Sequence, residues 1–200
     1  MQEIMRGIYT WRKFSEPHGY EFNGHLVLDG AGNICIDPVE PSSLDMAEIA
    51  RLGVAHIAIT NRNHSRAANL VRARTEAPVA IHPADAPHAR AQGLEADEDL
   101  APGQRIGPFL VVAASGKSPG EVALHWPERR LLIVGDAIIG HPPGKCSLLR
   151  EKVLDDPATL RRSVASLLDL DFDTLLVGDG VSLLSGAKAR VKELVASFPA

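Results

Sequence analysis

Polar residues that could do chemistry gather at four places, each directly after an apolar run that is typical of a strand. The first is residues 60–66, Thr-Asn-Arg-Asn-His-Ser-Arg, which follow the apolar run 57–59. The other three are the loop 116–121, Gly135-Asp136 and Gly178-Asp179-Gly180. Strand ends in α/β proteins commonly carry binding and catalytic groups. We therefore expect these four segments to converge at a common rim.

The elements that must position these clusters alternate along the chain. Residues 24–28 and 33–36 are predicted to form a hairpin, because Asp29-Gly30-Ala31-Gly32 between them tolerates positive φ. Apolar periodicity and capping residues predict the remaining elements. Helices are expected at 42–52, 65–74, 84–92, 156–170 and 186–198, and strands at 56–60, 79–82, 110–114, 122–125, 131–134 and 174–177.

The order of these elements predicts the fold class. Hairpins come first, then β-α-β-α, then hairpins again and a closing β-α unit. This order does not fit a doubly wound parallel sheet. It predicts a four-layer αββα sandwich, in which two mixed sheets pack face to face with helices outside. Residues 95–108 resemble a linker, but 200 residues suit one domain, and we expect a single domain over 1–200.

Composition excludes several classes of protein. The net charge of -4 is mild and no basic stripe is present, so a nucleic-acid partner is not expected. No apolar run is long enough to span a bilayer, and the N-terminus lacks the apolar core of a signal peptide. Cys35 and Cys146 have no CxxC spacing, which predicts reduced thiols in a cytoplasmic protein. The sequence gives no oligomeric state.

The order and separation of the four polar clusters resemble the motifs of the metallo-β-lactamase superfamily, whose fold is the αββα sandwich. The resemblance runs from about Tyr20 to Leu194. The family's Thr-His-x-His-x-Asp-His turn falls on residues 60–66, and its His-Thr-Pro-Gly-His loop falls on 117–121. Its strand-end Gly-Asp falls on 135–136, and its late Gly-His on 178–179. The resemblance implies a hydrolase with metal ions at these positions.

Most of the metal ligands that the resemblance implies are replaced. Only Asp136 keeps the ligand type. Other residues stand where the family has histidine or aspartate: Asn61, Asn63, Ser65, Arg66, Glu121 and Asp179. Amide oxygens are poor substitutes for imidazole on zinc, and a guanidinium cannot ligate a metal at all. A dinuclear zinc site is therefore not expected.

One interpretation is a metal site with oxygen ligands. Its ligands would be Asn61, Asn63, Glu121, Asp136 and Asp179. Such a set suits one Mg²⁺, Mn²⁺ or Ca²⁺ ion, which could activate water for hydrolysis of small esters, thioesters or phosphoesters. Asp136 and His64 are the predicted catalytic residues, with His64 as general base or as a group that orients a ligand. A turn histidine at this position is otherwise expected to be exposed.

The alternative interpretation is a metal-free, inactive family member. The carboxylates would then repel one another unless cations neutralise them, and three basic residues are available: Arg62, Arg66 and Lys117. Such a pocket would bind an anionic small molecule, a protein partner, or nothing beyond its own fold. The Pro/Gly-rich segment 141–146 follows Asp136 and is a candidate substrate lid, from which His141 could reach the ligand.

Overall fold

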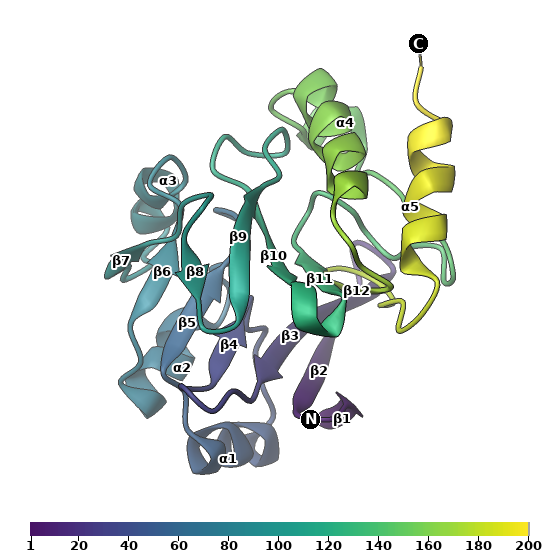
Figure 1. Ribbon diagram of the computed structural model, residues 1–200. Coiled ribbons are helices and arrows are strands. Elements are labelled where there is room, and N and C mark those ends of the chain that lie inside the picture. Colours follow the sequence, from purple (N-terminus) through teal and green to yellow (C-terminus); the bar gives the residue numbers. More distant parts are fainter. Residues whose placement is uncertain (200) are drawn as a thin grey trace.

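The computed structural model describes residues 1–199 and contains two mixed β-sheets with helices on their outer faces (Figure 1). The first sheet has the order β1-β2-β3-β4-β5-β6-β7: Gln2–Met5, Ile8–Ser15, Tyr20–Val27, Ile34–Ile36, His56–Ile59, Val79–Ile81 and Glu98–Asp99. The second has the order β12-β11-β10-β9-β8: Thr174–Val177, Leu131–Val134, Val122–Trp126, Phe109–Ala113 and Arg105–Ile106. The predicted αββα sandwich is confirmed.

Three apolar layers hold the sandwich together. The central layer packs β2, β3 and β4 of the first sheet against β9, β10 and β11 of the second. A second layer lies under helices α1 (Ser43–Leu52), α2 (Ala68–Thr75) and α3 (Ala86–Ala91). A third lies under α4 (Pro157–Ser166) and α5 (Ala187–Ala196). Each sheet therefore buries both of its faces, which leaves the strand ends as the places where polar groups can meet.

Both sheets mix antiparallel and parallel pairs. The hairpin predicted around residues 29–32 forms, with Val27 opposite Ile34 in the antiparallel β3–β4 pair. Strands β4 to β7 then run parallel. In the second sheet, β11 and β12 are parallel and Val134 lies opposite Val177. The four predicted clusters follow β5, β9, β11 and β12.

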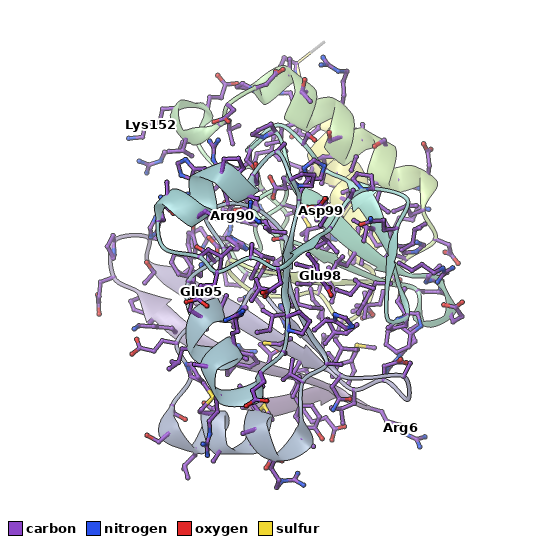
Figure 2. The ribbon with its side chains drawn as sticks, turned by 90° about the vertical axis from the view of Figure 1, so that its left-hand side faces the viewer. Arg6, Arg90, Glu95, Glu98, Asp99 and Lys152 are labelled. Carbon is purple, nitrogen blue, oxygen red and sulfur yellow. The ribbon has the colours of Figure 1, made fainter. Side chains whose placement is uncertain are left out.

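The structure differs from the sequence prediction in three places. Strands β1 and β2 were not predicted, and the linker-like residues 95–108 contain the short strands β7 and β8. Glu98 and Asp99 place exposed carboxylates on edge strand β7, where charge discourages pairing with another chain (Figure 2). Helix α2 begins at Ala68 rather than at residue 65, because Arg66 has a φ of 20°.

Within residues 1–199, no helix is both long and apolar enough to cross a bilayer.

Candidate functional site

The site lies where β5, β11 and β12 end, between the two sheets. Val134 and Val177 lie opposite each other in the parallel strands β11 and β12. Asp136 and Asp179 each follow two residues later, so both aspartates lie at the same end of the sheet. The segment after β5 contacts the second sheet at β10, through a backbone bond from Val122 N–H to Thr60 O, 2.9 Å long. Strand β3 closes the opposite side through Asn23 N–H and Gly178 O, 2.7 Å apart. The polar clusters therefore share one rim.

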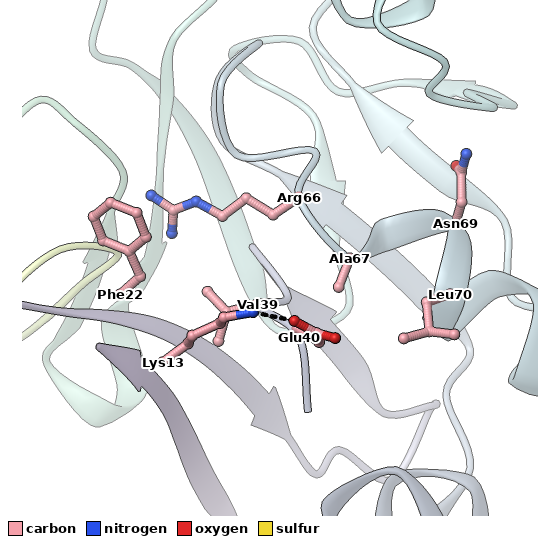
Figure 3. A pocket seen from close by; sticks show the side chains of 8 residues that line it. All are labelled: Lys13, Phe22, Val39, Glu40, Arg66, Ala67, Asn69 and Leu70. Atoms are coloured by element: carbon pink, nitrogen blue, oxygen red, sulfur yellow. Dashed lines mark hydrogen bonds and ion pairs between the residues drawn. The ribbon is translucent and has the colours of Figure 1, made fainter. Parts of the chain in front are cut away.

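Arg66 lies between this rim and strand β3. Its Nη2 is 2.6 Å from Asp179 Oδ1, and the guanidinium lies over the Phe22 ring, 4.2 Å from its centroid (Figure 3). Among residues 1–199, the buried Nη1 of Arg66 has no hydrogen-bond partner. Arg66 lies outside helix α2, with a φ of 20°, and its side chain reaches Asp179. Arg66 thus places a charge at the position where the sequence resemblance implies a metal-binding histidine.

Lys117 supplies a second buried cation. Its Nζ donates to Asn63 Oδ1 at 2.6 Å and lies 3.4 Å from Asp136 Oδ2.

Asp85 fixes the loop that carries Lys117. This fully buried carboxylate accepts bonds from Ser118 Oγ at 2.5 Å and from the Gly120 and Arg62 N–H groups at 2.9 Å. Asp85 therefore joins segment 60–66 to segment 116–121.

His64 is fully buried, which corrects the expectation of an exposed turn histidine. The Asn61 side chain accepts from Asn63 N–H at 2.8 Å and closes a tight turn that directs His64 inward. His64 Nδ1 lies 2.8 Å from Asp37 Oδ2, and Asp37 also accepts from Thr60 N–H at 2.8 Å. A Cβ atom on Gly178 would lie 2.4 Å from His64 Cε1, so only glycine fits beside the ring.

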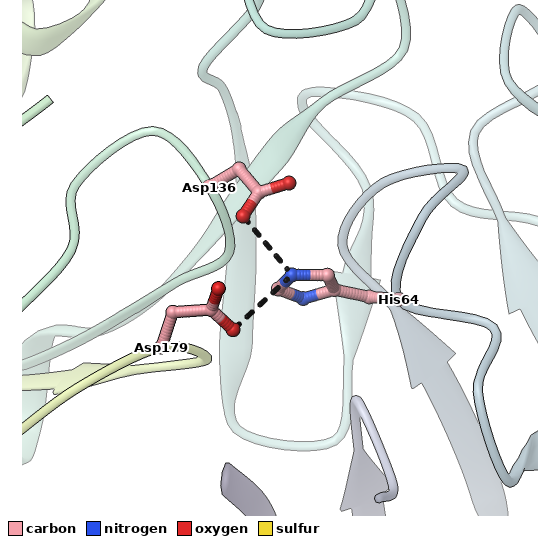
Figure 4. A group of neighbouring side chains, drawn as sticks. All are labelled: His64, Asp136 and Asp179. Carbon is pink, nitrogen blue, oxygen red and sulfur yellow. Dashed lines mark hydrogen bonds and ion pairs between the residues drawn. The ribbon is translucent and has the colours of Figure 1, made fainter. Parts of the chain in front are cut away.

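The other side of the His64 ring faces two carboxylates. Its Nε2 lies 3.3 Å from Asp136 Oδ1 and 3.9 Å from Asp179 Oδ1 (Figure 4). Burial and the nearby Arg66 charge oppose protonation of His64, but Asp37 and Asp136 outweigh them and raise its pKa to about 10. An imidazolium has no free lone pair, so the predicted role of general base does not fit His64 in this arrangement.

The surroundings shift the pKa values of the site's carboxyl groups in opposite directions. Burial opposes ionisation of Asp136, but His64 and Lys117 hold its pKa far below the ordinary range. Glu121 is buried beside Asn61, whose Nδ2 is 3.3 Å from Glu121 Oε1, and burial raises the pKa of Glu121 well above normal. Burial also raises the pKa of Asp179, although Arg66 and His64 act in the opposite sense.

Basic side chains lie against most of these carboxylates. His64 contacts Asp37 and Asp136, Lys117 contacts Asp136, and Arg66 contacts Asp179. Such contacts reduce the repulsion that bare carboxylates would feel in a buried site.

Two predicted pocket residues lie apart from the carboxylates. Arg62 does not neutralise them. Asp85 accepts from the Arg62 backbone N–H, and the Arg62 side chain turns outward. Its guanidinium donates to Asp155 at 2.6 Å in an exposed position. His141 is exposed and lies with its ring centroid 5.2 Å from that of Tyr20. It lines the mouth of the cavity rather than its floor.

A cavity of about 890 Å³ opens above the rim. Asn63, Arg66, Lys117, Asp136 and Asp179 form its polar part. This volume lies within the range of about 300–1,000 Å³ that is typical of small-molecule sites. A smaller cavity of about 540 Å³ lies beside it and shares Phe22 and Arg66 with it (Figure 3).

One group of side chains could hold a metal ion. Ligand atoms of His64, Asp136 and Asp179 all lie within 4.8 Å of one another, which makes this group a candidate site for an ion. Glu121 does not join the group. The amide oxygens of Asn61 and Asn63, predicted as ligands, accept bonds from Asn63 N–H and Lys117 Nζ instead. Asn61 and Asn63 thus have protein donors and lie outside the group, and a dinuclear site does not fit the residues present.

Comparison with known proteins places the chain in a family. A family model described as the metallo-beta-lactamase superfamily matches residues 1–198. The chain belongs to the metallo-β-lactamase superfamily. The predicted resemblance to this family is confirmed. No curated protein matches the sequence.

Solved structures share the superfamily fold. TTHA1623 in a di-iron-bound form is 27% identical, with a TM-score of 0.68 over 90% of this chain and 98% of its own. The metallo-β-lactamase FIM-1 from Pseudomonas aeruginosa in a mono-zinc form is 18% identical, with a TM-score of 0.77 over 98% and 95%. The metallo-β-lactamase from Pontibacter korlensis is 15% identical, with a TM-score of 0.77 over 98% of each chain. The last two likenesses concern the fold alone.

Sequence reasoning missed two residues that organise the site. Asp37 directly follows strand β4, so the rule that located the other clusters at strand ends would have found it. Asp85 precedes helix α3, where an aspartate is ordinarily explained as a helix cap. Its side chain instead forms hydrogen bonds to segments 60–66 and 116–121. Each bonded residue lies more than twenty positions from Asp85 in the chain, so no local sequence pattern reveals these contacts.

Proposed function

We propose that this protein is a metal-independent member of the superfamily that binds small anionic molecules in the 890 Å³ cavity. One observation carries the proposal. Arg66 stands at a family ligand position and contacts Asp179, while Lys117 lies in the loop segment that matches a family motif and contacts Asp136. Two side-chain cations thus supply positive charge where the superfamily uses metal ions.

These cations have hydrogen-bonding capacity left for a ligand. A lysine ammonium has three N–H donors, and Lys117 has partners in two directions, Asn63 and Asp136. Arg66 lines the cavity and donates to Asp179 through Nη2, whereas its Nη1 is buried. A carboxylate or phosphate oxygen accepts such charged donors readily. The floor of the cavity therefore suits an anion better than a neutral ligand.

Charges at the mouth of the cavity act in the same direction. Arg150 and Lys152 line it, and both are exposed. Their positive charges give the entrance a field that attracts anions. His64 is locked between Asp37 and Asp136 and is cationic, so it offers no base for hydrolysis. This arrangement supports the proposal of binding without turnover.

Metal analysis and titration with an anion test the proposal together. We expect purified protein to carry far less than one transition-metal ion per chain and to bind inorganic phosphate. Lys117→Ala should weaken phosphate binding about tenfold, which equals ~1.4 kcal/mol. Lys192→Ala, on exposed helix α5, is the matched control and should leave binding unchanged. One tightly held ion per chain together with no phosphate binding would contradict the proposal.

A second candidate function is hydrolysis of small esters, thioesters or phosphoesters with one divalent ion. It is favoured by the convergence of His64, Asp136 and Asp179, and by the Asp37–His64 contact, since metal-bound histidines usually donate to a carboxylate. Nitrophenyl acetate and nitrophenyl phosphate, assayed with Mg²⁺, Mn²⁺ or Ca²⁺, test it. Turnover that needs the ion and disappears in Asp136→Asn would favour this candidate.

A further inference from the structure

Four aromatic rings line one side of the cavity: His18, Tyr20, Phe22 and His141, here called the aromatic wall. The rings of His18 and Phe22 have centroids 5.2 Å apart, as do those of Tyr20 and His141. Tyr20 and Phe22 are 6.0 Å apart and meet edge to face. Since they are two residues apart on β3, they lie on the same side of the sheet. The wall is thus a continuous row of rings.

The aromatic wall remains open to the cavity. His18 and His141 are exposed, and Tyr20 and Phe22 are only partly buried. None of the four belongs to the fully buried core, although Phe22 packs at the edge of the layer beneath α1, α2 and α3. His18, His141 and the partly buried Tyr20 therefore leave ring surface for a ligand, whereas the Arg66 guanidinium covers one face of Phe22.

The wall meets the cations of the floor directly. The Arg66 guanidinium lies 4.2 Å from the Phe22 centroid and holds Asp179 with its other side. Tyr20 lies close enough to the floor that burial, Asp179 and Asp136 together raise its pKa to about 12. Its phenol therefore stays protonated and keeps a hydrogen-bond donor beside the carboxylates. A charged corner and an aromatic face thus share one cavity.

We infer that the ligand of this cavity is a planar aromatic ring that carries one anionic group, a carboxylate or a phosphate. The anionic group lies at Lys117 and Arg66, and the ring lies against the aromatic wall. This inference rests on the proposed function, because it names the class of anion that the cavity selects. Contacts between aromatic rings favour the binding of a flat π-system over that of a puckered ring of equal size and charge.

Two matched ligand pairs test the inference by calorimetry. Benzoate is compared with cyclohexanecarboxylate, and phenyl phosphate with cyclohexyl phosphate. Within the pair that binds, we expect the planar member to bind about fivefold more tightly. Whichever pair binds identifies the anionic group. Tyr20→Leu and His141→Ala should each bring the ratio of the two affinities, planar to puckered, closer to one. Tyr20→Phe should leave this ratio unchanged.

Phe14→Leu is the control, since Phe14 lies on the neighbouring strand β2 and is 50% exposed outside this cavity. It should leave the preference unchanged. Equal binding of the planar and puckered members would overturn the inference and leave the proposed function standing. Binding of none of the four compounds, with phosphate also unbound, would overturn both. A preference that survives both Tyr20→Leu and His141→Ala would show that the aromatic wall is not its source.

Discussion

The polar residues of the site form two groups that differ in what surrounds them. The inner group, Asp37, Asn61, His64 and Glu121, is at most 1% exposed and contacts only protein. The outer group consists of Arg66, Lys117, Asp136 and Asp179, and all four line the cavity. The inner group fixes the turn after β5, while the outer group presents paired charges to a ligand. Stability and binding are therefore separable within one cluster.

The difference between the groups shows what side chains can replace when metal-binding histidines are absent. A bound ion would both cross-link the strand ends and supply positive charge. In this chain the cross-link comes from the inner group, through His64 between Asp37 and Asp136. The charge offered to a ligand comes from the outer group, through Arg66 and Lys117. Mutations in the two groups should consequently have different effects.

The largest expected effect is on stability, from a change in the inner group. His64→Ala should lower the free energy of unfolding by ~3–5 kcal/mol, because it leaves Asp37 buried without its cation. Urea denaturation measures this. His88→Ala, at an exposed position of helix α3, is the control and should change stability by less than about 0.5 kcal/mol. A His64→Ala protein as stable as the parent would remove the distinction between the groups.

The next largest effect is on the pH dependence of stability. The pKa of His64 is about 10 in the folded protein and 6.5 in its ordinary state, so protonation stabilises the fold. This stabilisation is complete below pH 6.5 and is lost as pH rises toward 10. We expect a slope approaching ~1.4 kcal/mol per pH unit between these limits, steeper than in His64→Ala. Identical slopes in the two proteins would show that His64 is not held as an imidazolium.

A smaller loss of stability is expected in the outer group. Arg66→Ala should cost ~1–2 kcal/mol, less than the buried pair of the inner group, because its side chain is 17% exposed. Arg62→Ala is a matched control, since the Arg62–Asp155 pair is more exposed and should contribute less than about 1 kcal/mol. Thermal unfolding of the two variants compares them. Equal losses would mean that the Arg66–Asp179 pair contributes no more than a surface ion pair.

The smallest effect concerns the entrance. Neutralising Arg150 and Lys152 together should slow association of phosphate a few-fold at low salt and leave stability unchanged, because both are exposed. Stopped-flow measurement at low and high ionic strength checks this. If the rate does not depend on salt in the parent protein, the field at the entrance has no role.

The fold could be predicted from the sequence because it depends on local patterns. Apolar runs ending in Gly-Asp located β11 and β12, and their parallel pairing brings Asp136 and Asp179 together. Strand β2 escaped prediction because Arg12, Lys13 and Ser15 in its second half break the apolar pattern. Element order was informative even where single elements were missed.

The site was less predictable because its geometry depends on tertiary contacts. The inward direction of His64 follows from a side-chain turn at Asn61 and from the carboxylate of Asp37, twenty-seven residues away along the chain. The outward direction of Arg62 follows from Asp85 and Asp155. The residue types at the motif positions therefore indicated which metal ligands are replaced. They did not indicate which side chains the replacing residues contact.

Anomalous diffraction from crystals grown with Zn²⁺ or Mn²⁺, recorded at the absorption edge of the metal, tests the central claim most directly. The proposed metal independence predicts no anomalous peak at the rim, with the Arg66 guanidinium on Asp179 and the Lys117 ammonium beside Asp136. A peak bonded to His64 Nε2, Asp136 and Asp179, with Arg66 and Lys117 displaced, would contradict it.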